Sequence, residues 1–338
     1  MAYDVSVVPC GDYAYETVRP ALEKAVAAVG GLDFVRPGMK IALKTNLVIF
    51  ASPDRAATTH PMVLRALCDL LTERGASVVI GDSPGGIYTP AYLKSVYRAC
   101  GLTDLVREGV SLNENVAEKQ ADFPEAVSAR HFTYTAYLDD ADAIIDVCKL
   151  KTHGMMGMSC AAKNFFGTIP GTMKPEYHFR YPTYEAFADM LIDLNDYFKP
   201  RLAVCDAVVG MEGNGPTAGT PRKIGCLLVS PSTHKLDLVA ASIIGLTKEK
   251  VPTLQAAHRR GLIPENAEDL AVSGDPAAFF VPDFKNVATL SGLGFNGASG
   301  NVLHQLFGKT VGASAIYAYG RRFAQDSFSC APAIPSSM

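Results

Sequence analysis

Short apolar segments that alternate with amphipathic helical patterns constrain the fold of this 338-residue chain more than any other feature. In the first hundred residues each apolar run is followed by a pattern with apolar residues every three or four positions, and glycine or proline separates them. The predicted strands are 4–9, 39–44 and 77–80, and the predicted helices are 17–29, 61–74 and 90–100. This alternation is typical of a parallel sheet covered by helices on both faces, so the sequence predicts an α/β fold with mostly parallel sheets.

The alternation is interrupted by a more polar stretch at 102–140, in which a hairpin is expected around 131–137. It then resumes. The later predicted strands are 143–147, 202–205 and 223–230, and the later predicted helices are 184–198 and 236–245.

The domain organisation has no clear linker to mark it. We expect two α/β lobes with the site between them, residues 1–200 and 201–320, divided near Pro200. Residues 321–338 end in a run rich in proline and serine and are predicted to be a disordered tail.

The composition excludes several classes of protein. Apolar residues make up 48% of the chain, charged residues 19%, and the formal net charge is −3. This balance is globular, and no basic stripe is present that would neutralise the phosphates of nucleic acid. No window of about 18 uncharged apolar residues is found, so no membrane span is expected. The first residues lack the features of a targeting signal, and a cytoplasmic location is therefore expected.

The eight cysteines contain no Cys-x-x-Cys pair. Zinc and iron–sulfur sites usually show such pairs, because a short loop aims two thiolates at one metal. Most of the cysteines are therefore interpreted as buried apolar thiols. Cys148 and Cys160 are the exceptions, because they flank the polar segment described next.

Four predicted strands are followed by polar or glycine-rich loops, at 44–46, 81–86, 149–171 and 206–222. In open α/β sheets, ligands bind beyond the carboxyl ends of the strands, where loops meet the first turns of helices. The sequence therefore predicts one site to which all four loops contribute.

The loop predicted at 149–171 carries most of the candidate chemistry. Lys149, Lys151, His153 and Lys163 bring ammonium groups and an imidazole into a segment otherwise made of apolar and small residues. Such groups are costly to bury without partners, so we interpret them as gathered around an anionic ligand. The alternative is a surface loop with solvated lysines.

The other loops supply further candidates. Thr59 and His60 precede Pro61 at a predicted helix start, a position suited to phosphate or carboxylate. Asp82 is a candidate acid/base or metal-binding carboxylate, or only a wall of the pocket, and His178 alone reads as a surface histidine. The predicted ligand- or cofactor-binding residues are Lys44, Asn46, Thr59, His60, Ser83, Lys151, Lys163 and Asn164.

Six short motifs carry a resemblance that covers nearly the whole chain. They are Lys44-Thr-Asn, Thr59-His-Pro, Gly81-Asp-Ser-Pro, Lys149-Leu-Lys-Thr-His, Lys163-Asn, and Met211-Glu-Gly-Asn-Gly-Pro after Asp206. Through them the chain resembles the domain-of-unknown-function family 362. Many members of that family carry a ferredoxin-like pair of four-iron clusters. This chain lacks their cysteine pattern, so no intrinsic iron–sulfur cluster is expected.

A more distant resemblance links the chain to nickel-pincer lactate racemases and their relatives. That family has a histidine, a lysine ten residues later and a second histidine after a loop, as His153, Lys163 and His178 do here. The resemblance implies that His153 is an acid/base, that Lys163 is joined to a pincer nucleotide and that His178 is a metal ligand. The family's second catalytic histidine is replaced here by Asp82, which is a poorer proton carrier near neutral pH unless its pKa is raised.

Three functions are compatible with these residues. The favoured one is an enzyme, of isomerase or oxidoreductase type, that acts on a small organic acid or polar metabolite by proton or hydride transfer. His153, Lys163 and Asp82 are its predicted catalytic residues, and His178 its predicted metal ligand, with nickel, iron or a pincer-type nucleotide as candidate cofactors. The alternatives are a non-catalytic binding module for a nucleotide or phosphorylated metabolite, and a redox protein that lacks its own ferredoxin module. The expected partner is a small anion, not nucleic acid or membrane, and an oligomer is not excluded.

Overall fold

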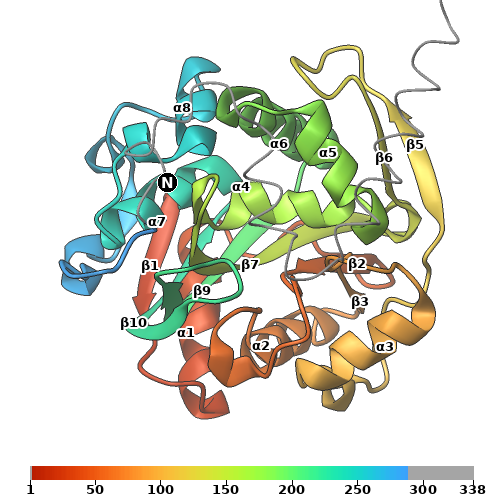
Figure 1. The fold of residues 1–338 in the computed structure, drawn as a ribbon. Helices are drawn as coiled ribbons and strands as arrows, with labels where there is room; N and C mark the ends of the chain where they lie inside the picture. Colours follow the sequence, from red (N-terminus) through yellow and green to blue (C-terminus); the bar gives the residue numbers. More distant parts are fainter. Residues whose placement is uncertain (1, 288–338) are drawn as a thin grey trace, which may run out of the picture. The chain divides into compact units, whose positions relative to one another are not determined.

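The computed structural model describes residues 2–287, and a nine-stranded sheet runs through them. The strand order is β11-β1-β10-β9-β7-β2-β3-β4, with β8 added to β7 (Figure 1). The strands are β1 (Val5–Pro9), β2 (Lys40–Thr45), β3 (Ser77–Gly81), β4 (Val110–Leu112), β7 (Ala143–His153), β8 (Gly157–Ser159), β9 (Leu202–Glu212), β10 (Thr220–Ser230) and β11 (Val272–Ser273). Strands β4, β3, β2, β7 and β9 are mutually parallel, whereas β10 runs antiparallel to both β9 and β1. The α/β prediction with a mostly parallel sheet is confirmed.

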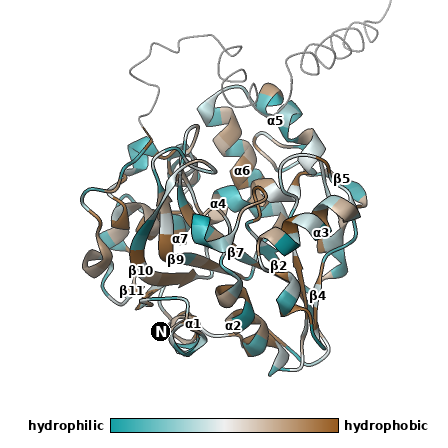
Figure 2. Ribbon diagram, turned by 60° about the horizontal axis from the view of Figure 1, so that its bottom comes forward, coloured by the Kyte–Doolittle hydropathy of each residue, from teal (hydrophilic) through white to brown (hydrophobic). Residues whose placement is uncertain are grey.

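Helices cover both faces of this sheet (Figure 1). They are α1 (Tyr15–Ala28), α2 (Pro61–Thr72), α3 (Pro90–Ala99), α4 (Ala161–Asn164), α5 (Lys174–Arg180), α6 (Tyr184–Phe198), α7 (Thr233–Ile243) and α8 (Pro252–Arg259). Alternate residues of β7 point to the two faces: Ile145 and Val147 pack with α1, α2 and α3, while Ile144 and Cys148 pack with α4, α6, α7 and α8. The strands between the two helix layers are largely apolar (Figure 2).

Local signals set several helix starts. Proline occupies a first-turn position of α2 and α3, where its missing N–H costs no hydrogen bond. The Thr89 side chain accepts a hydrogen bond from the Tyr92 N–H at the start of α3, and Thr183 caps α6 in the same way. The predicted helix at 184–198 has the same bounds as α6.

The polar stretch 102–140 contributes to two sheets. Strand β4 joins the edge of the main sheet beside β3. Strands β5 (Glu118–Asp122) and β6 (His131–Thr135) pair antiparallel in a separate two-stranded sheet, and β6 lies where the hairpin is predicted.

The predicted division near Pro200 falls between two strands that pair with each other. Strand β9, which follows Pro200, lies parallel to β7, and residues 2–287 belong to one compact unit. The end of the predicted second lobe and the tail predicted at 321–338 lie outside the described residues. Among residues 2–287, no helix has the length and apolar character needed to cross a membrane.

Candidate functional site

The first part of the predicted loop at 149–171 is sheet. Strand β7 continues to His153, and β8 folds back on it so that Lys151 pairs with Ser159 and His153 with Gly157. Gly157 has a φ of +67°, and a Cβ there would lie 2.2 Å from the Lys250 carbonyl oxygen, so the turn requires glycine. The loop prediction is therefore wrong for residues 149–153, which form a buried strand. Likewise, the loop predicted at 206–222 is shortened to 213–219 by β9 and β10.

Lys149 is neutralised inside the protein. Its Nζ lies 2.9 Å from Oδ2 of Asp206, and neither side chain is exposed. The Tyr13 hydroxyl accepts a hydrogen bond from Lys149 and donates one to Asp206, each at 2.8 Å. This buried pair holds β7 to β9 and supplies no charge to a ligand.

Lys44 and Asp82 form a second buried ion pair, at 2.8 Å. The Asp82 carboxylate also accepts hydrogen bonds from the backbone N–H groups of Leu47, at 2.7 Å, and Ser83, at 2.9 Å. Both oxygens are therefore occupied. The Lys44 ammonium donates to the Thr45 carbonyl as well. Asp82 joins the loops after β2 and β3, and a proton-transfer role would require these bonds to break.

Two further ammonium groups, those of the buried Lys151 and the half-buried Lys174, donate hydrogen bonds only to neutral oxygens. Lys151 donates to Oδ1 of Asn46 at 2.9 Å and to the Ala57 carbonyl at 2.7 Å. Burial, with the charges of Lys163 and Lys149, lowers the pKa of Lys151 to about 7.

Lys174, on the first turn of α5, donates to the carbonyls of Ser83, Phe166 and Ile169 at 2.6–3.0 Å. Burial and the nearby Lys44 and Lys163 charges lower its pKa to about 7. Sequence reasoning missed Lys174. Its one signal was its place four residues before His178.

Lys163 and His178 meet at the ring of Phe166. The Lys163 Nζ lies 5.4 Å from the ring centre, and the Lys174 Nζ lies 5.2 Å from it. The His178 ring meets Phe166 edge-on at 5.4 Å and stacks on Phe187 at 4.7 Å. Burial and the Lys44 charge lower the pKa of Lys163 to about 8. Within residues 2–287, no hydrogen bond or ion pair joins the Lys163 ammonium to another side chain.

His153 lies at the end of β7 next to these groups. Its Nδ1 accepts hydrogen bonds from the backbone N–H groups of Met155 and Met156, both at 3.1 Å, so the neutral ring carries its proton on Nε2. Burial, and the charges of Lys163, His178 and Lys151, lower its pKa well below the ordinary value. His153 is thus within electrostatic range of Lys163 and His178, which themselves meet at the Phe166 ring. We call Lys151, His153, Lys163, Lys174 and His178 the lysine–histidine cluster.

Asn46 and Asn164 connect the cluster to β2. The Asn46 side-chain amide donates to Oδ1 of Asn164 at 2.9 Å, and Asn164 donates to Asp146 at 2.6 Å. Ser83 lies at the edge of the same network, where its backbone carbonyl accepts from Lys174. These three predicted residues are thus brought to the cluster.

Thr59 accepts a hydrogen bond from the Asn46 N–H at 3.1 Å and so adjoins this network, whereas His60 lies in a different place. Thr59 donates to the Val147 carbonyl at 2.7 Å, and the His60 ring stacks on Tyr13 at 3.6 Å, beside the Lys149–Asp206 pair. Burial lowers the pKa of His60 to about 4. A cavity of about 560 Å³ is lined by Tyr13, Ser52, Pro53, Asp54, His60 and Val209. The structure therefore places His60 at a cavity whose lining does not include Lys163.

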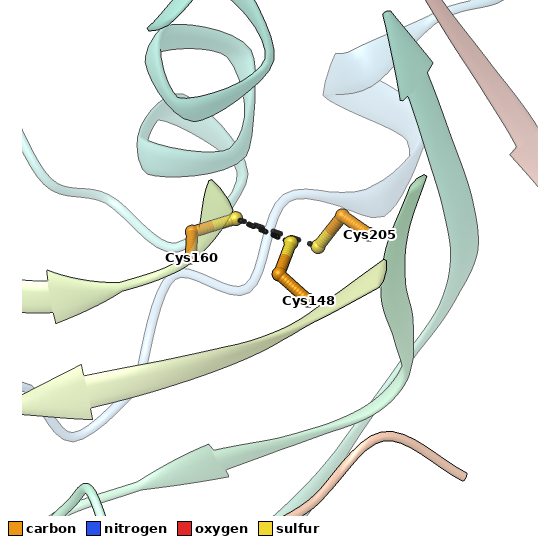
Figure 3. A group of neighbouring side chains, drawn as sticks. All are labelled: Cys148, Cys160 and Cys205. Atoms are coloured by element: carbon orange, nitrogen blue, oxygen red, sulfur yellow. Dashed lines mark hydrogen bonds between the residues drawn. The ribbon is translucent and has the colours of Figure 1, made fainter. Parts of the chain in front are cut away.

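Three buried cysteines form the other set of candidate metal ligands in the described part of the chain (Figure 3). The Cys160 Sγ lies 3.7 Å from that of Cys148 and 3.5 Å from that of Cys205, and all three sulfurs lie within 4.8 Å of one another. We call Cys148, Cys160 and Cys205 the cysteine cluster. The sequence singled out two of its members but not Cys205.

Comparisons with known proteins place the chain in a family. The model of the family described as "Domain of unknown function (DUF362)" matches residues 41–242. The thylakoid-associated protein sll1697 of Synechocystis is 31% identical over 288 residues, which cover 84% of this chain and 88% of that protein.

Two solved structures are more distant. The lactate racemase apoprotein of Thermoanaerobacterium thermosaccharolyticum is 12% identical over 69% of this chain, with a TM-score of 0.44. A protein from Thermotoga maritima is 13% identical over 59% of this chain, with a TM-score of 0.34. The aligned parts span only 55% and 51% of those two chains. On the family model and the Synechocystis relative, this chain belongs to the DUF362 family.

Proposed function

We propose that the chain is an enzyme that acts on a small organic acid by proton or hydride transfer, with the lysine–histidine cluster as its site. One observation carries the proposal: the charge of the cluster is unbalanced. Lys44 and Lys149 each have a buried carboxylate partner, whereas Lys151 and Lys174 bind only neutral oxygens and Lys163 faces a ring. An anionic ligand would supply the missing negative charge.

The geometry suggests a role for each group. We propose Lys163 as the electrostatic clamp for a substrate carboxylate, because its ammonium has no competing partner among the described residues. His153 would present its Nε2–H to the substrate, and acting as a base would require Nδ1 to release its two backbone N–H partners. His178 would contact the substrate or a bound metal. Asp82, committed to Lys44, would position the loops and not carry the proton.

A cofactor at this site would use the same groups. We propose that a metal such as nickel or iron would be held by His178, and that a pincer-type nucleotide would be attached to Lys163. Such a group would supply electrophilic or hydride-accepting chemistry when bound. The residues fit in that the Lys163 amine is not engaged in a hydrogen bond within residues 2–287, which leaves it available for attachment.

A second function is favoured by the cavity at His60. Its stacked Tyr13 and His60 rings and its volume of about 560 Å³ suit a small aromatic ligand such as the base of a nucleotide. A non-catalytic binding module would use this cavity, and the cluster would then be a structural charge network. In both cases the proposed partner is a small molecule rather than nucleic acid or membrane, and the proposed location is cytoplasmic.

Deuterium exchange separates the two functions. The full chain is incubated in D₂O with a panel of 2-hydroxy and 2-oxo acids, and exchange of substrate carbon-bound hydrogen is followed by NMR. An enzyme that transfers protons incorporates deuterium into one member, and Lys163→Ala abolishes the exchange. The exposed Lys24→Ala serves as the matched control and leaves it unchanged.

The negative outcomes differ as well. Reduction of a 2-oxo acid with an added nicotinamide, without exchange, would assign hydride transfer. Ligand-induced thermal stabilisation without exchange or turnover, sensitive to His60→Ala and not to Lys163→Ala, would assign the binding module and overturn the enzyme proposal.

A further inference from the structure

The cysteine cluster has the composition and spacing of a site for a thiophilic metal. Its sulfurs come from β7, from the residue before α4, and from β9, and each of the three side chains is at most 1% exposed (Figure 3). Cys148 and Cys205 are direct partners in the parallel register of β7 and β9. Cys160 approaches both from the turn that follows β8.

The distances fit a single bound ion. Around a tetrahedral ion with metal–sulfur bonds of about 2.3 Å, neighbouring sulfurs are separated by about 3.8 Å. The separations of Cys160 from Cys148 and from Cys205, 3.7 and 3.5 Å, lie close to that value, and the third lies within 4.8 Å. Three thiolates with no imidazole select soft closed-shell ions over magnesium or calcium.

We propose that Cys148, Cys160 and Cys205 bind one thiophilic closed-shell metal ion of the zinc class, at a structural site separate from the lysine–histidine cluster. Binding releases the three thiol protons to solvent and forms three metal–sulfur bonds, with no change of oxidation state. A divalent ion leaves a smaller buried net charge on three thiolates than a monovalent ion does, which favours zinc over copper(I).

Asp237 lies beside the cysteine cluster, but its carboxylate is not among the ligand atoms that lie within 4.8 Å of one another. It lies on α7 next to Cys160, and its carboxylate accepts hydrogen bonds from the N–H groups of Ala161, at 2.7 Å, and Ala162, at 3.0 Å. Structural zinc is normally coordinated by four ligands, whereas copper(I) can be coordinated by three thiolates alone. A fourth ligand from Asp237 would require its carboxylate to release one of these N–H groups, and zinc would depend on that ligand more than copper(I) would.

The position of the sulfurs explains what such an ion would do. Lys149 follows Cys148 and Asp206 follows Cys205, so each strand cysteine adjoins one half of a buried ion pair. Helix α4 starts directly after Cys160 and carries Lys163. One ion would tie together the three elements that position both the ion pair and the lysine–histidine cluster. This inference does not depend on the reaction proposed above.

Metal analysis of the full chain tests the site. The protein is produced without a metal-binding tag, in medium supplemented with zinc or with copper, and purified anaerobically without chelator. Elemental analysis and native mass spectrometry then count the bound metal. We expect one zinc per chain, and replacement by cadmium should add a sulfur-to-metal charge-transfer band in the ultraviolet.

Variants assign the ligands. Cys148→Ala, Cys160→Ala and Cys205→Ala should each lose the metal. Cys68→Ala, a buried cysteine in the core on the α1–α3 face, should retain it. Asp237→Asn should weaken zinc more than copper.

Two outcomes overturn the proposal even where a variant fails to fold, because both are read on the unaltered chain. The first is absence of stoichiometric zinc or copper after anaerobic reconstitution. The second is an intact mass that is lower by two hydrogens, together with two cysteines that an alkylating reagent does not modify. That result would show a disulfide in place of a metal site.

Discussion

Lys163 and His178 contact the same aromatic ring, that of Phe166, and each lies 5.4 Å from its centre. Among residues 2–287, no carboxylate forms an ion pair with the Lys163 ammonium. The pKa of His178 falls to about 3, mainly through burial and then through the charges of Lys163 and Lys174. Protonating these groups is unfavourable in the ligand-free protein, and a bound anion would offset that cost. We therefore expect an anion to bind there.

Removal of the Lys163 charge should stabilise the ligand-free protein in a pH-dependent way. Its pKa of about 8 in the folded chain lies below the ordinary 10.5, so the unfolded chain binds more protons between these values. The contribution of this group to wild-type stability therefore rises with pH across that window. Lys163→Met should gain about 1–2 kcal/mol near pH 7, and the gain should shrink towards pH 10.

Urea unfolding of wild type and variant at several pH values measures this difference. The exposed Lys24→Met provides the control and should show no such trend. A gain for Lys163→Met that is the same at every pH would mean that Lys163 titrates normally.

The Lys149–Asp206 pair should be structural. Lys149→Met leaves the Asp206 carboxylate buried without its partner, and Asp206→Asn leaves the Lys149 ammonium so. Each variant should lose about 3–5 kcal/mol of unfolding free energy. Replacing both, as in Lys149→Met with Asp206→Leu, should recover most of that loss. Lys94→Met removes an exposed ion pair with Glu114 and should change stability by less than about 0.5 kcal/mol. Equal effects from the buried and exposed pairs would contradict this assignment.

Gly167 should be intolerant of any side chain. A Cβ there would lie 2.0 Å from Oδ1 of Asp82 and 2.6 Å from Nζ of Lys44. Gly167→Ala should therefore separate the buried ion pair and destabilise the protein by about 1–3 kcal/mol. Gly154→Ala is the matched control, because its Cβ would meet nothing within 4 Å. Thermal unfolding of the two variants side by side checks the difference, and an equally stable Gly167→Ala would show that the loop after α4 can move aside.

Much of the fold could be predicted from local patterns. Helix α6 matches its predicted bounds, and α2 and α3 start at the predicted prolines. The extension of β7 could not be predicted, because lysine and histidine at 149, 151 and 153 alternate with apolar residues in a way that also suits an exposed loop. They are buried because their partners, among them Asp206 and Asn46, come from distant parts of the chain.

The grouping of the candidate residues could be predicted only in part. The convergence of His153, Lys163 and His178 follows from loops at one edge of a sheet, which spacing can suggest. The contributions of Lys174 and Cys205 depend on tertiary contacts: three carbonyls gather around the Lys174 ammonium, and the register of β7 and β9 brings Cys205 to Cys148. No repeating pattern in the sequence predicts either the carbonyls around Lys174 or the pairing of Cys205 with Cys148.

The reactivity of Lys163 towards a trace acylating reagent, read by peptide mass spectrometry as a function of pH, tests the central claim most directly. We predict that labelling of Lys163 rises with a midpoint near pH 8, well before Lys24, and that millimolar amounts of the active organic acid protect Lys163 alone. Labelling of Lys163 with a midpoint near 10.5 and no protection by any small carboxylate would contradict the proposed anion site.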